Sequence, residues 1–220
     1  MPTSNVEVAN EALTLLGETA ISALNQDADR ARAINRLYVP SLDQALRGHD
    51  WNFARMRANL ARLQATPEFG YDYMYQLPQE PLCLRVLTTN LAANEPWEIE
   101  TFQTADVTSQ YRVILTDATA LEIRYIARVT SPTLWDALFA DAFVHELARR
   151  ACYAITRNAT LVAELSQEAK ERWAKARSVD GQESRALQQW LSNSFTEGRS
   201  VPRLQLVLNS FASGEWSPRL

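Results

Sequence analysis

The chain has 220 residues, of which 46% are hydrophobic and 22% charged, a composition typical of a folded globular protein rather than a disordered one. A net charge of -4, with a pI of about 5.3, argues against a protein whose main task is to bind nucleic acid. The sequence has no run of about 18 uncharged apolar residues and no start typical of a signal peptide, so we expect no membrane segment and synthesis in the cytoplasm.

Charge is distributed unevenly along the chain. Residues 66–123 contain nine acidic residues and two arginines, which gives this segment a net charge of -7. Of the 22 basic residues, only Lys170 and Lys175 are lysines. Because arginine is favoured at protein interfaces and lysine is depleted there, this bias suggests assembly with other subunits. A GC-rich genome would produce the same bias, and the sequence does not separate the two explanations.

Two helices are predicted in the first fifty residues. Thr3 or Ser4 can cap the first helix, and Gly17 stands where a glycine commonly ends one. The second runs from about Asp27 to Arg47 with apolar residues at three-to-four spacing. Pro40 lies inside it, and we expect a kink or a break there because proline lacks a backbone donor.

Residues 51–130 are predicted to form short strands. Six runs rich in aromatic and β-branched residues are separated by Pro, Asn, Asp and Gly. In LEIRYI, apolar Leu121, Ile123 and Tyr125 alternate with polar residues, which indicates a strand with one buried face. The six runs are WNFARMRANLARL, YDYMYQLP, LCLRVLT, PWEIETF, YRVILT and LEIRYIARV.

Helical periodicity returns at residue 131. Ser131 as cap and Pro132 at the first helical position predict the start of a long helix that ends near residue 158. A more polar helix follows over about Thr160–Arg177. Beyond Gly181 the chain loses sustained periodicity but keeps large apolar residues, so we expect residues 181–220 to form an arm that covers its own domain or docks on another chain.

Few residues suited to catalysis or metal binding are present. Cys83 and Cys152 have no metal-ligand spacing around them, and we expect two reduced core cysteines. HELAR (145–149) resembles the beginning of a zinc-protease helix, but Arg149 stands where the second histidine is needed, so His145 is expected to be a hydrogen-bonding residue. Phosphate-loop and dinucleotide glycine motifs are absent from the sequence. We expect no cofactor, no metal and no catalytic residue.

A pair of carboxylates offers the one enzymatic alternative. Glu98 and Glu100 lie on one face if WEIET is a strand, and two acids at such spacing can hydrolyse glycosides. An exposed, solvated face explains the same pattern more simply. The alternative function is therefore a hydrolase of cell-wall glycan, and a monomeric scaffold or chaperone is a third.

Several segments, in order along the chain, resemble one protein family. His49-x-Trp51-x-Phe53-Ala54 follows a helix ending in a Leu-rich turn, and EALTLLGE (11–18) precedes that helix. YDYMYQLPQEPLCLRVL (71–87) and LEIRYIARVTSPTLWDALFADAF (121–143) follow in the same order. The set resembles the tail tubular protein A family of bacteriophage head-to-tail adaptors over about residues 4–178.

This resemblance implies a structural function. Members of the family form a dodecameric ring between the portal and the tail nozzle or further tail proteins, and DNA passes through the ring without specific binding. We therefore expect a virion-tail protein that is assembled in the host cytoplasm and is not an enzyme. The acidic segment would line the lumen or dock the next tail protein, since a passage for DNA must not hold it.

The expected fold is α+β and helix-dominated. Helices in 1–50 and 131–180 form one bundle, residues 51–130 form a small inserted antiparallel β lobe, and residues 181–220 form an extended C-terminal arm. Buried aromatic side chains dominate interface energies, so the arm is the predicted portal-binding element. Its candidate contact residues are Trp190, Phe195, Arg203, Leu206, Phe211 and Trp216.

Overall fold

The protein has a mixed α+β fold with 46% helix and 23% strand. The structure is a computed structural model. It describes residues 2–103 and 109–196, with side chains described as far as residue 183 in the last helix. The chain divides into two compact units, Met1–Arg177 and Ser178–Leu220. The predicted α+β class, with more helix than strand, is confirmed.

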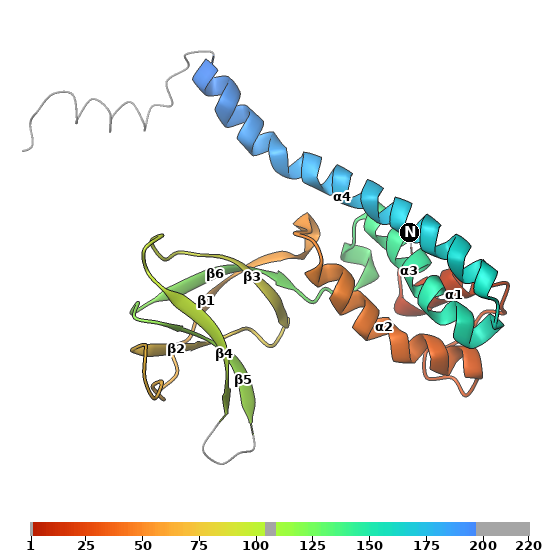
Figure 1. The fold of residues 1–220 in the computed structure, drawn as a ribbon, viewed down its shortest axis with the longest axis horizontal. Coiled ribbons are helices and arrows are strands. Elements are labelled where there is room, and N and C mark those ends of the chain that lie inside the picture. Colours follow the sequence, from red (N-terminus) through yellow and green to blue (C-terminus); the bar gives the residue numbers. More distant parts are fainter. Residues whose placement is uncertain (1, 104–108, 197–220) are drawn as a thin grey trace, which may run out of the picture. The chain divides into compact units, whose positions relative to one another are not determined.

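Four α-helices are present in the described residues: α1 (Asn5–Leu15), α2 (Asp29–Arg47), α3 (Ala137–Thr156) and α4 (Ala159–Thr196). Helix α3 contacts both α1 and α2 (Figure 1). The first part of α4 joins the same hydrophobic core through Leu165 and Ala176, with Trp173 packed against it. The predicted apolar face of α3 is confirmed, because Phe139, Phe143 and their neighbours on that face are buried.

Helix α1 begins and ends at the predicted signals. The Ser4 hydroxyl accepts a hydrogen bond from the Glu7 amide at 3.2 Å and so satisfies one of the free N–H groups of the first turn. Gly17 follows the helix with φ of +72°, a conformation that glycine adopts without steric strain.

Of the kink or break expected at Pro40, the break does not occur, because α2 continues through this residue to Arg47. Pro40 and the preceding Val39 lie on the exposed side of the helix. The carbonyl of Arg36, which loses its usual donor, therefore faces water and can be hydrated. The buried side of α2, with Ile34, Tyr38 and Leu42, packs into the core and holds the helix together.

The start of α3 also differs from the prediction. Ser131 and Pro132 begin only a short 3-10 turn, Pro132–Leu134, and α3 starts five residues later at Ala137. Asp136 is the residue that caps it, since its carboxylate accepts hydrogen bonds from the amides of Leu138 and Phe139.

Helix α4 is longer than predicted. The narrow apolar stripe is confirmed by buried Leu165 and Ala169, but the helix runs past Arg177 and Gly181 to Thr196. Its continuation follows from composition, because the residues after Gly181 include several strong helix formers (Gln, Glu, Arg, Ala and Leu). One isolated glycine costs only about 1 kcal/mol in a helix.

All six predicted strands are present. Sheet A has the order β1-β6-β3 and sheet B the order β2-β5-β4, with antiparallel pairing throughout. The first run begins with a 3-10 turn, Asn52–Ala54, before its strand. The strands are β1 (Arg55–Leu60), β2 (Tyr73–Gln76), β3 (Cys83–Thr89), β4 (Trp97–Gln103), β5 (Gln110–Thr116) and β6 (Leu121–Ala127).

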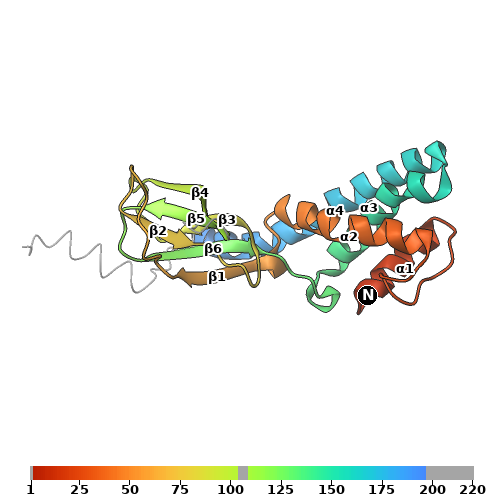
Figure 2. The same cartoon turned by 90° about the horizontal axis from the view of Figure 1, so that it is seen from below.

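The inner faces of the two sheets form a second core (Figure 2). Leu121, Ile123 and Tyr125 of sheet A meet Tyr75 and Ile114 of sheet B there, which confirms the alternation read from LEIRYI. At one end the outer face of sheet A belongs to the helical core, through Leu84 and Ile126. Both cysteines are free and buried, as predicted, Cys83 in the β lobe and Cys152 among the helices.

Candidate functional site

The predicted contact residues of the C-terminal arm lie largely outside the described residues. Trp190 and Phe195 belong to helix α4, whose backbone is described there and whose side chains are not. Arg203, Leu206, Phe211 and Trp216 all follow residue 196. Side chains are described for residues 2–103 and 109–183.

Two arginines lie directly opposite each other on the outer face of sheet A. Arg57 of β1 is the cross-strand partner of Arg124 of β6, and Thr88 of β3 pairs with Arg124 on its other side. Cross-strand partners share a face with their Cβ atoms about 5 Å apart, so two positive charges stand side by side here. We call Arg57 and Arg124 the arginine pair.

Within the described residues, neither member of the arginine pair makes a salt bridge or a side-chain hydrogen bond. The Nε atom of Arg124 is buried and has no hydrogen-bond partner there, and the Nε atom of Arg85, on the same face, is in the same state. Arg55, two residues before Arg57 on β1, is by contrast held by Asp50 at 3.0 Å. Buried donors without partners and like charges in direct opposition both destabilise a fold, so the pair points to a ligand rather than to a role in stability.

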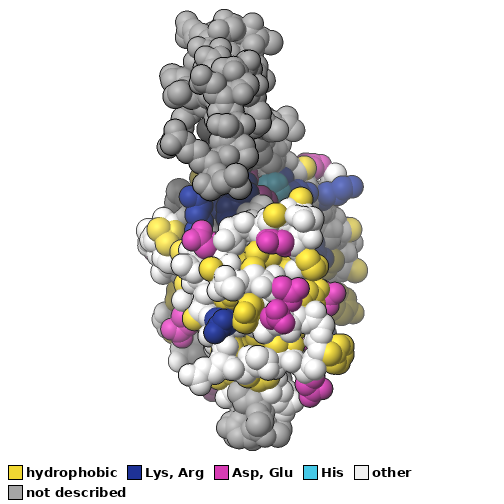
Figure 3. Space-filling model, turned by 90° about the vertical axis from the view of Figure 1, so that its left-hand side faces the viewer, with side chains coloured by type: hydrophobic (Ala, Val, Ile, Leu, Met, Phe, Trp, Pro, Cys, Tyr) yellow, Lys and Arg dark blue, Asp and Glu magenta, His cyan; other side chains and the backbone are white. Residues whose placement is uncertain are grey.

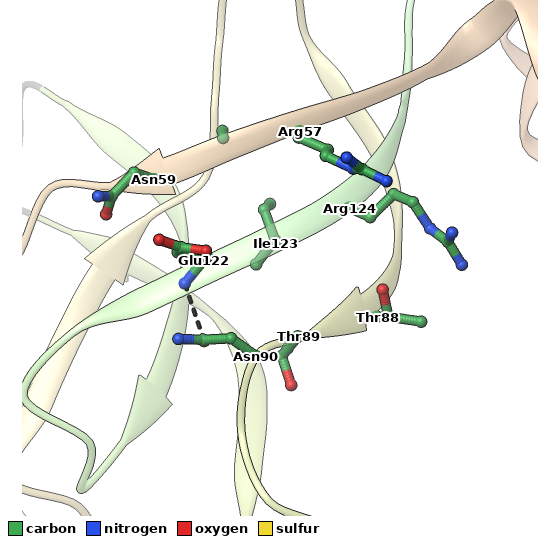
Figure 4. A pocket seen from close by; sticks show the side chains of 9 residues that line it. Arg57, Asn59, Thr88, Thr89, Asn90, Glu122, Ile123 and Arg124 are labelled. Carbon is green, nitrogen blue, oxygen red and sulfur yellow. Dashed lines mark hydrogen bonds between the residues drawn. The ribbon is translucent and has the colours of Figure 1, made fainter. Parts of the chain in front are cut away.

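The arginine pair lines a shallow pocket of about 430 Å³. Figure 4 shows the two guanidinium groups at one end of this pocket, with Glu122 and Asn59 at the other. The amide oxygen of Asn90 accepts a hydrogen bond from the Glu122 amide at 3.0 Å, which fixes that end. Thr88 and Thr89 supply hydroxyl groups between the two ends, so the pocket suits an anionic, hydrogen-bonding ligand.

An acidic strand occupies the outer face of sheet B. Strand β4 is an edge strand of that sheet, and six of its seven residues are exposed. Glu98 and Glu100 pair with Leu115 and Val113, so they lie on the outer face above the small cluster of Met74, Val113 and Leu115. Figure 3, which faces the β-lobe end of Figure 1, shows acidic side chains interspersed with hydrophobic ones. We call β4 the acidic strand.

A groove of about 600 Å³ runs beside the acidic strand, lined by Glu98, Glu100, Phe69 and Tyr71 among others. The pKa of Tyr71 is raised, first by desolvation and then by the charge and hydrogen bonding of Glu98 and the charges of Asp117 and Glu100. A negative field of this kind discourages a second anion and attracts a cation.

The arrangement of the groove bears on the carboxylate-pair hypothesis. Glu98 and Glu100 do share a face, as predicted, with Cα atoms about 7 Å apart along the strand. Both side chains are exposed to water, however, whereas a general acid in such enzymes is set in an apolar pocket. The strand therefore places the two glutamates on one face, but the groove does not enclose either of them in an apolar pocket.

The two histidines lie among the helices. His145 is buried, with Nδ1 2.9 Å from the Asp141 carbonyl oxygen and Nε2 3.5 Å from Glu168, which agrees with a hydrogen-bonding residue. His49 lies edge-on to Trp51 beside a cleft of about 300 Å³ that Glu146 and Arg150 also line. Among residues 2–103 and 109–183, no group of three or more His, Cys, Asp or Glu is placed to hold a metal ion.

Sequence reasoning missed the arginine pair. The arginines of ARMRANLAR, and the alternation of polar and apolar residues in LEIRYIAR, were visible in the sequence. Which arginines meet depends on the register between β1 and β6, strands that lie far apart in the chain.

No helix in the described part of the chain is long and apolar enough to cross a membrane. No protein-family model matches the chain, and no curated protein was found to match it.

Proposed function

We propose that this protein is a ring-forming structural adaptor of a bacteriophage tail, which joins the portal to the downstream tail and lets DNA pass. One observation carries the proposal beyond sequence likeness. Three of the segments on which the resemblance rests, 38–63, 71–87 and 121–143, are far apart in the chain, yet they meet at one junction between the helices and the β lobe.

Four contacts define this junction. Arg128, in YIARV, pairs with Asp43 of α2 at 2.6 Å. Trp51 and Phe53, in the HxWxFA segment, pack against Phe139 with ring centroids 5.0 and 4.9 Å apart. Arg47 donates to the carbonyl oxygen of Leu84, in the LCLRVL run. Motif segments that follow a fixed order along the chain and pack together at one place act as parts of one structural unit. This supports the proposed family.

The finer organisation belongs to the same proposal. Helices from 1–50 and 131–180 act as a bundle, residues 51–130 as an inserted lobe, and residues 181–220 as the arm that binds the portal through Trp190, Phe195, Arg203, Leu206, Phe211 and Trp216. The protein would function in the virion tail after assembly in the host cytoplasm, as a dodecamer that also contacts the nozzle or another downstream tail protein. Catalysis, a cofactor and a membrane play no part in this function.

Electron microscopy of the purified chain, mixed with the portal protein of the same phage, tests the proposal. We expect class averages with a ring stacked on one face of the portal, and light scattering of the isolated complex should give the mass of about twelve copies per portal. A labelled DNA duplex should show no change in anisotropy with the chain at physiological salt. A chain that never sits on the portal contradicts the adaptor function.

The groove beside the acidic strand favours one second candidate, a tail-associated hydrolase of cell-wall glycan. Glu98 and Glu100 line it together with aromatic Phe69 and Tyr71, side chains of a kind that commonly contact sugar rings. Loss of turbidity of a cell-wall suspension measures this activity. A decrease that disappears in Glu98→Gln and Glu100→Gln, but persists in Glu164→Gln on α4, would favour the hydrolase over the adaptor.

A further inference from the structure

The arginine pair forms no salt bridge in the part of the chain that the structure describes. Arg57 and Arg124 oppose each other across β1 and β6, and Glu122, two residues before Arg124 on the same face of β6, forms no salt bridge with either arginine (Figure 4). Arginine forms planar, two-point hydrogen bonds with carboxylates, and two adjacent guanidinium groups suit two adjacent carboxylates. The missing partner should therefore carry two negative charges about 5 to 7 Å apart.

The chain itself carries such an arrangement on another surface. Glu98 and Glu100 are two residues apart on one face of the acidic strand, which places their Cα atoms about 7 Å apart. The strand forms an edge of sheet B and six of its seven residues are exposed, among them Glu98 and Glu100, which are open to water beside the groove that Phe69 and Tyr71 also line. An edge strand also offers unpaired backbone groups to a neighbour.

The two surfaces lie on opposite sides of one sandwich. Arg57 and Arg124 face outward from sheet A, Glu98 and Glu100 face outward from sheet B, and the shared hydrophobic core separates them. One copy therefore cannot join its own two surfaces. Contacts between unlike surfaces of identical copies are head-to-tail, and they produce rings when the rotation between copies closes.

We propose that the arginine pair of one copy binds Glu98 and Glu100 of the next copy. The contact rests on the proposed ring function and assigns the surfaces through which neighbouring copies meet. A carboxylate pair of a second copy fits better than the phosphates of nucleic acid, because the chain has a net charge of -4 and residues 51–130 carry nine acidic residues against seven arginines, so the protein as a whole does not attract a polyanion at long range.

Charge reversal on each surface tests the contact. One variant carries Arg57→Glu with Arg124→Glu, and the other carries Glu98→Arg with Glu100→Arg. Sedimentation velocity over a concentration series, at low and at high salt, measures association of the full chain. We expect each variant alone to associate roughly thirtyfold more weakly than the natural sequence. An equimolar mixture of the two should associate again, because each variant then meets a surface of opposite charge.

Matched controls reverse the same number of charges elsewhere. Arg36→Glu with Lys175→Glu, and Glu164→Arg with Glu171→Arg, all at exposed helix positions, should leave association unchanged. Association of both β-lobe variants at the natural level overturns the contact. If portal-bound rings persist in those variants, the proposed contact is wrong and the proposed adaptor function is unaffected. If the natural chain never associates, alone or on the portal, both fall.

Disulfide trapping gives a second measurement that does not depend on charge at Arg124. A chain with Arg57→Cys and Glu100→Cys should form a ladder of covalent multimers under mild oxidation, and the native cysteines should contribute little because both are buried. The control pair Arg36→Cys and Glu100→Cys should give at least tenfold less cross-linked product. Equal ladders in both variants overturn the proposal, as does binding of labelled duplex DNA that the reversal of the arginine pair abolishes.

Discussion

Arg128 donates two hydrogen bonds to the Asp43 carboxylate, with Nε 2.6 Å from Oδ1 and a terminal guanidinium nitrogen 2.5 Å from Oδ2. The pair joins the end of sheet A to helix α2, and its side chains are only 31% and 27% exposed. Partial burial and two-point geometry distinguish it from the exposed pair of Arg32 and Asp27 at the start of α2.

Removal of one partner should therefore destabilise the fold. Asp43→Ala leaves a partly buried guanidinium without its carboxylate, and we expect the free energy of unfolding in urea to fall by about 2 to 3 kcal/mol. The double variant with Arg128→Met should lose less than the sum of the two single variants. Asp27→Ala serves as the exposed control and should have no measurable effect. Additive losses at Asp43 and Arg128 would show that the pair is not coupled.

Pro40→Ala should stabilise the protein. The substitution restores a backbone donor for the carbonyl of Arg36 inside α2, and it removes a clash with the preceding turn. Part of the gain is offset because proline also restricts the unfolded chain. We expect the free energy of unfolding to rise by about 1 to 3 kcal/mol. Val39→Ala, an exposed neighbour on the same helix, is the control; an unchanged or lower midpoint for Pro40→Ala contradicts this account.

Glu146 should make stability depend on acid pH. Burial by itself raises the pKa of this carboxyl, but hydrogen bonds from Arg149 and Arg150 outweigh burial, and the pKa in the folded state is lowered from 4.5. A lowered pKa stabilises the fold at pH values above the unfolded pKa, and the stabilisation is lost as pH falls through the folded pKa. Unfolding free energies measured between about pH 6 and about pH 3 should decline less steeply in Glu146→Gln than in the natural sequence.

The thiol of Cys83 should react slowly in the native protein. Burial raises its pKa to about 11, although the charges of Arg112 and Arg47 act in the opposite direction. At pH 8 only about 0.1% of such a thiol is ionised, and the thiolate is the reactive species. In a Cys152→Ala variant, Ellman's reagent should label Cys83 only slowly in the folded protein. After denaturant is added, one thiol per chain should react rapidly. Rapid labelling of the folded variant would mean that the β-lobe core opens readily.

Deletion of residues 200–220 should separate folding from portal binding. The predicted contacts Leu206, Phe211 and Trp216 are lost, whereas both hydrophobic cores consist of residues before 178. We expect an unchanged melting temperature and the loss of stacking on the portal in electron micrographs. Phe211→Ala with Trp216→Ala should reproduce the loss in a chain of full length. Stacking that survives the deletion would remove the arm from the portal-binding surface.

The sequence predicts local structure well where one signal dominates. Strict alternation in LEIRYI identifies β6, and Ser4 with Gly17 delimits α1 correctly. Predictions fail where tertiary packing competes with a local signal. At Pro40 the packed face of α2 overrides the break, and at Ser131 a later cap, Asp136, starts the helix.

The candidate site lies further from what sequence can determine. Glu98 and Glu100 are neighbours on one strand, so a period of two places them together. Arg57 and Arg124 become neighbours only through the register of β1 against β6, which loop lengths and the core on the other face of the sheet fix together.

Both ends of the β lobe are fixed to the same helix. The Trp51 indole donates to the carbonyl oxygen of Ala45 where the chain enters the lobe, and Arg128 holds Asp43 where it leaves. Leu84 and Ile126 also pack in the helical core, so it is the residues of the lobe away from that core that can diverge in length and charge without disturbing the helices. Such a lobe can be replaced as a cassette, and related chains would keep their anchor residues long after the rest of the lobe had changed beyond recognition.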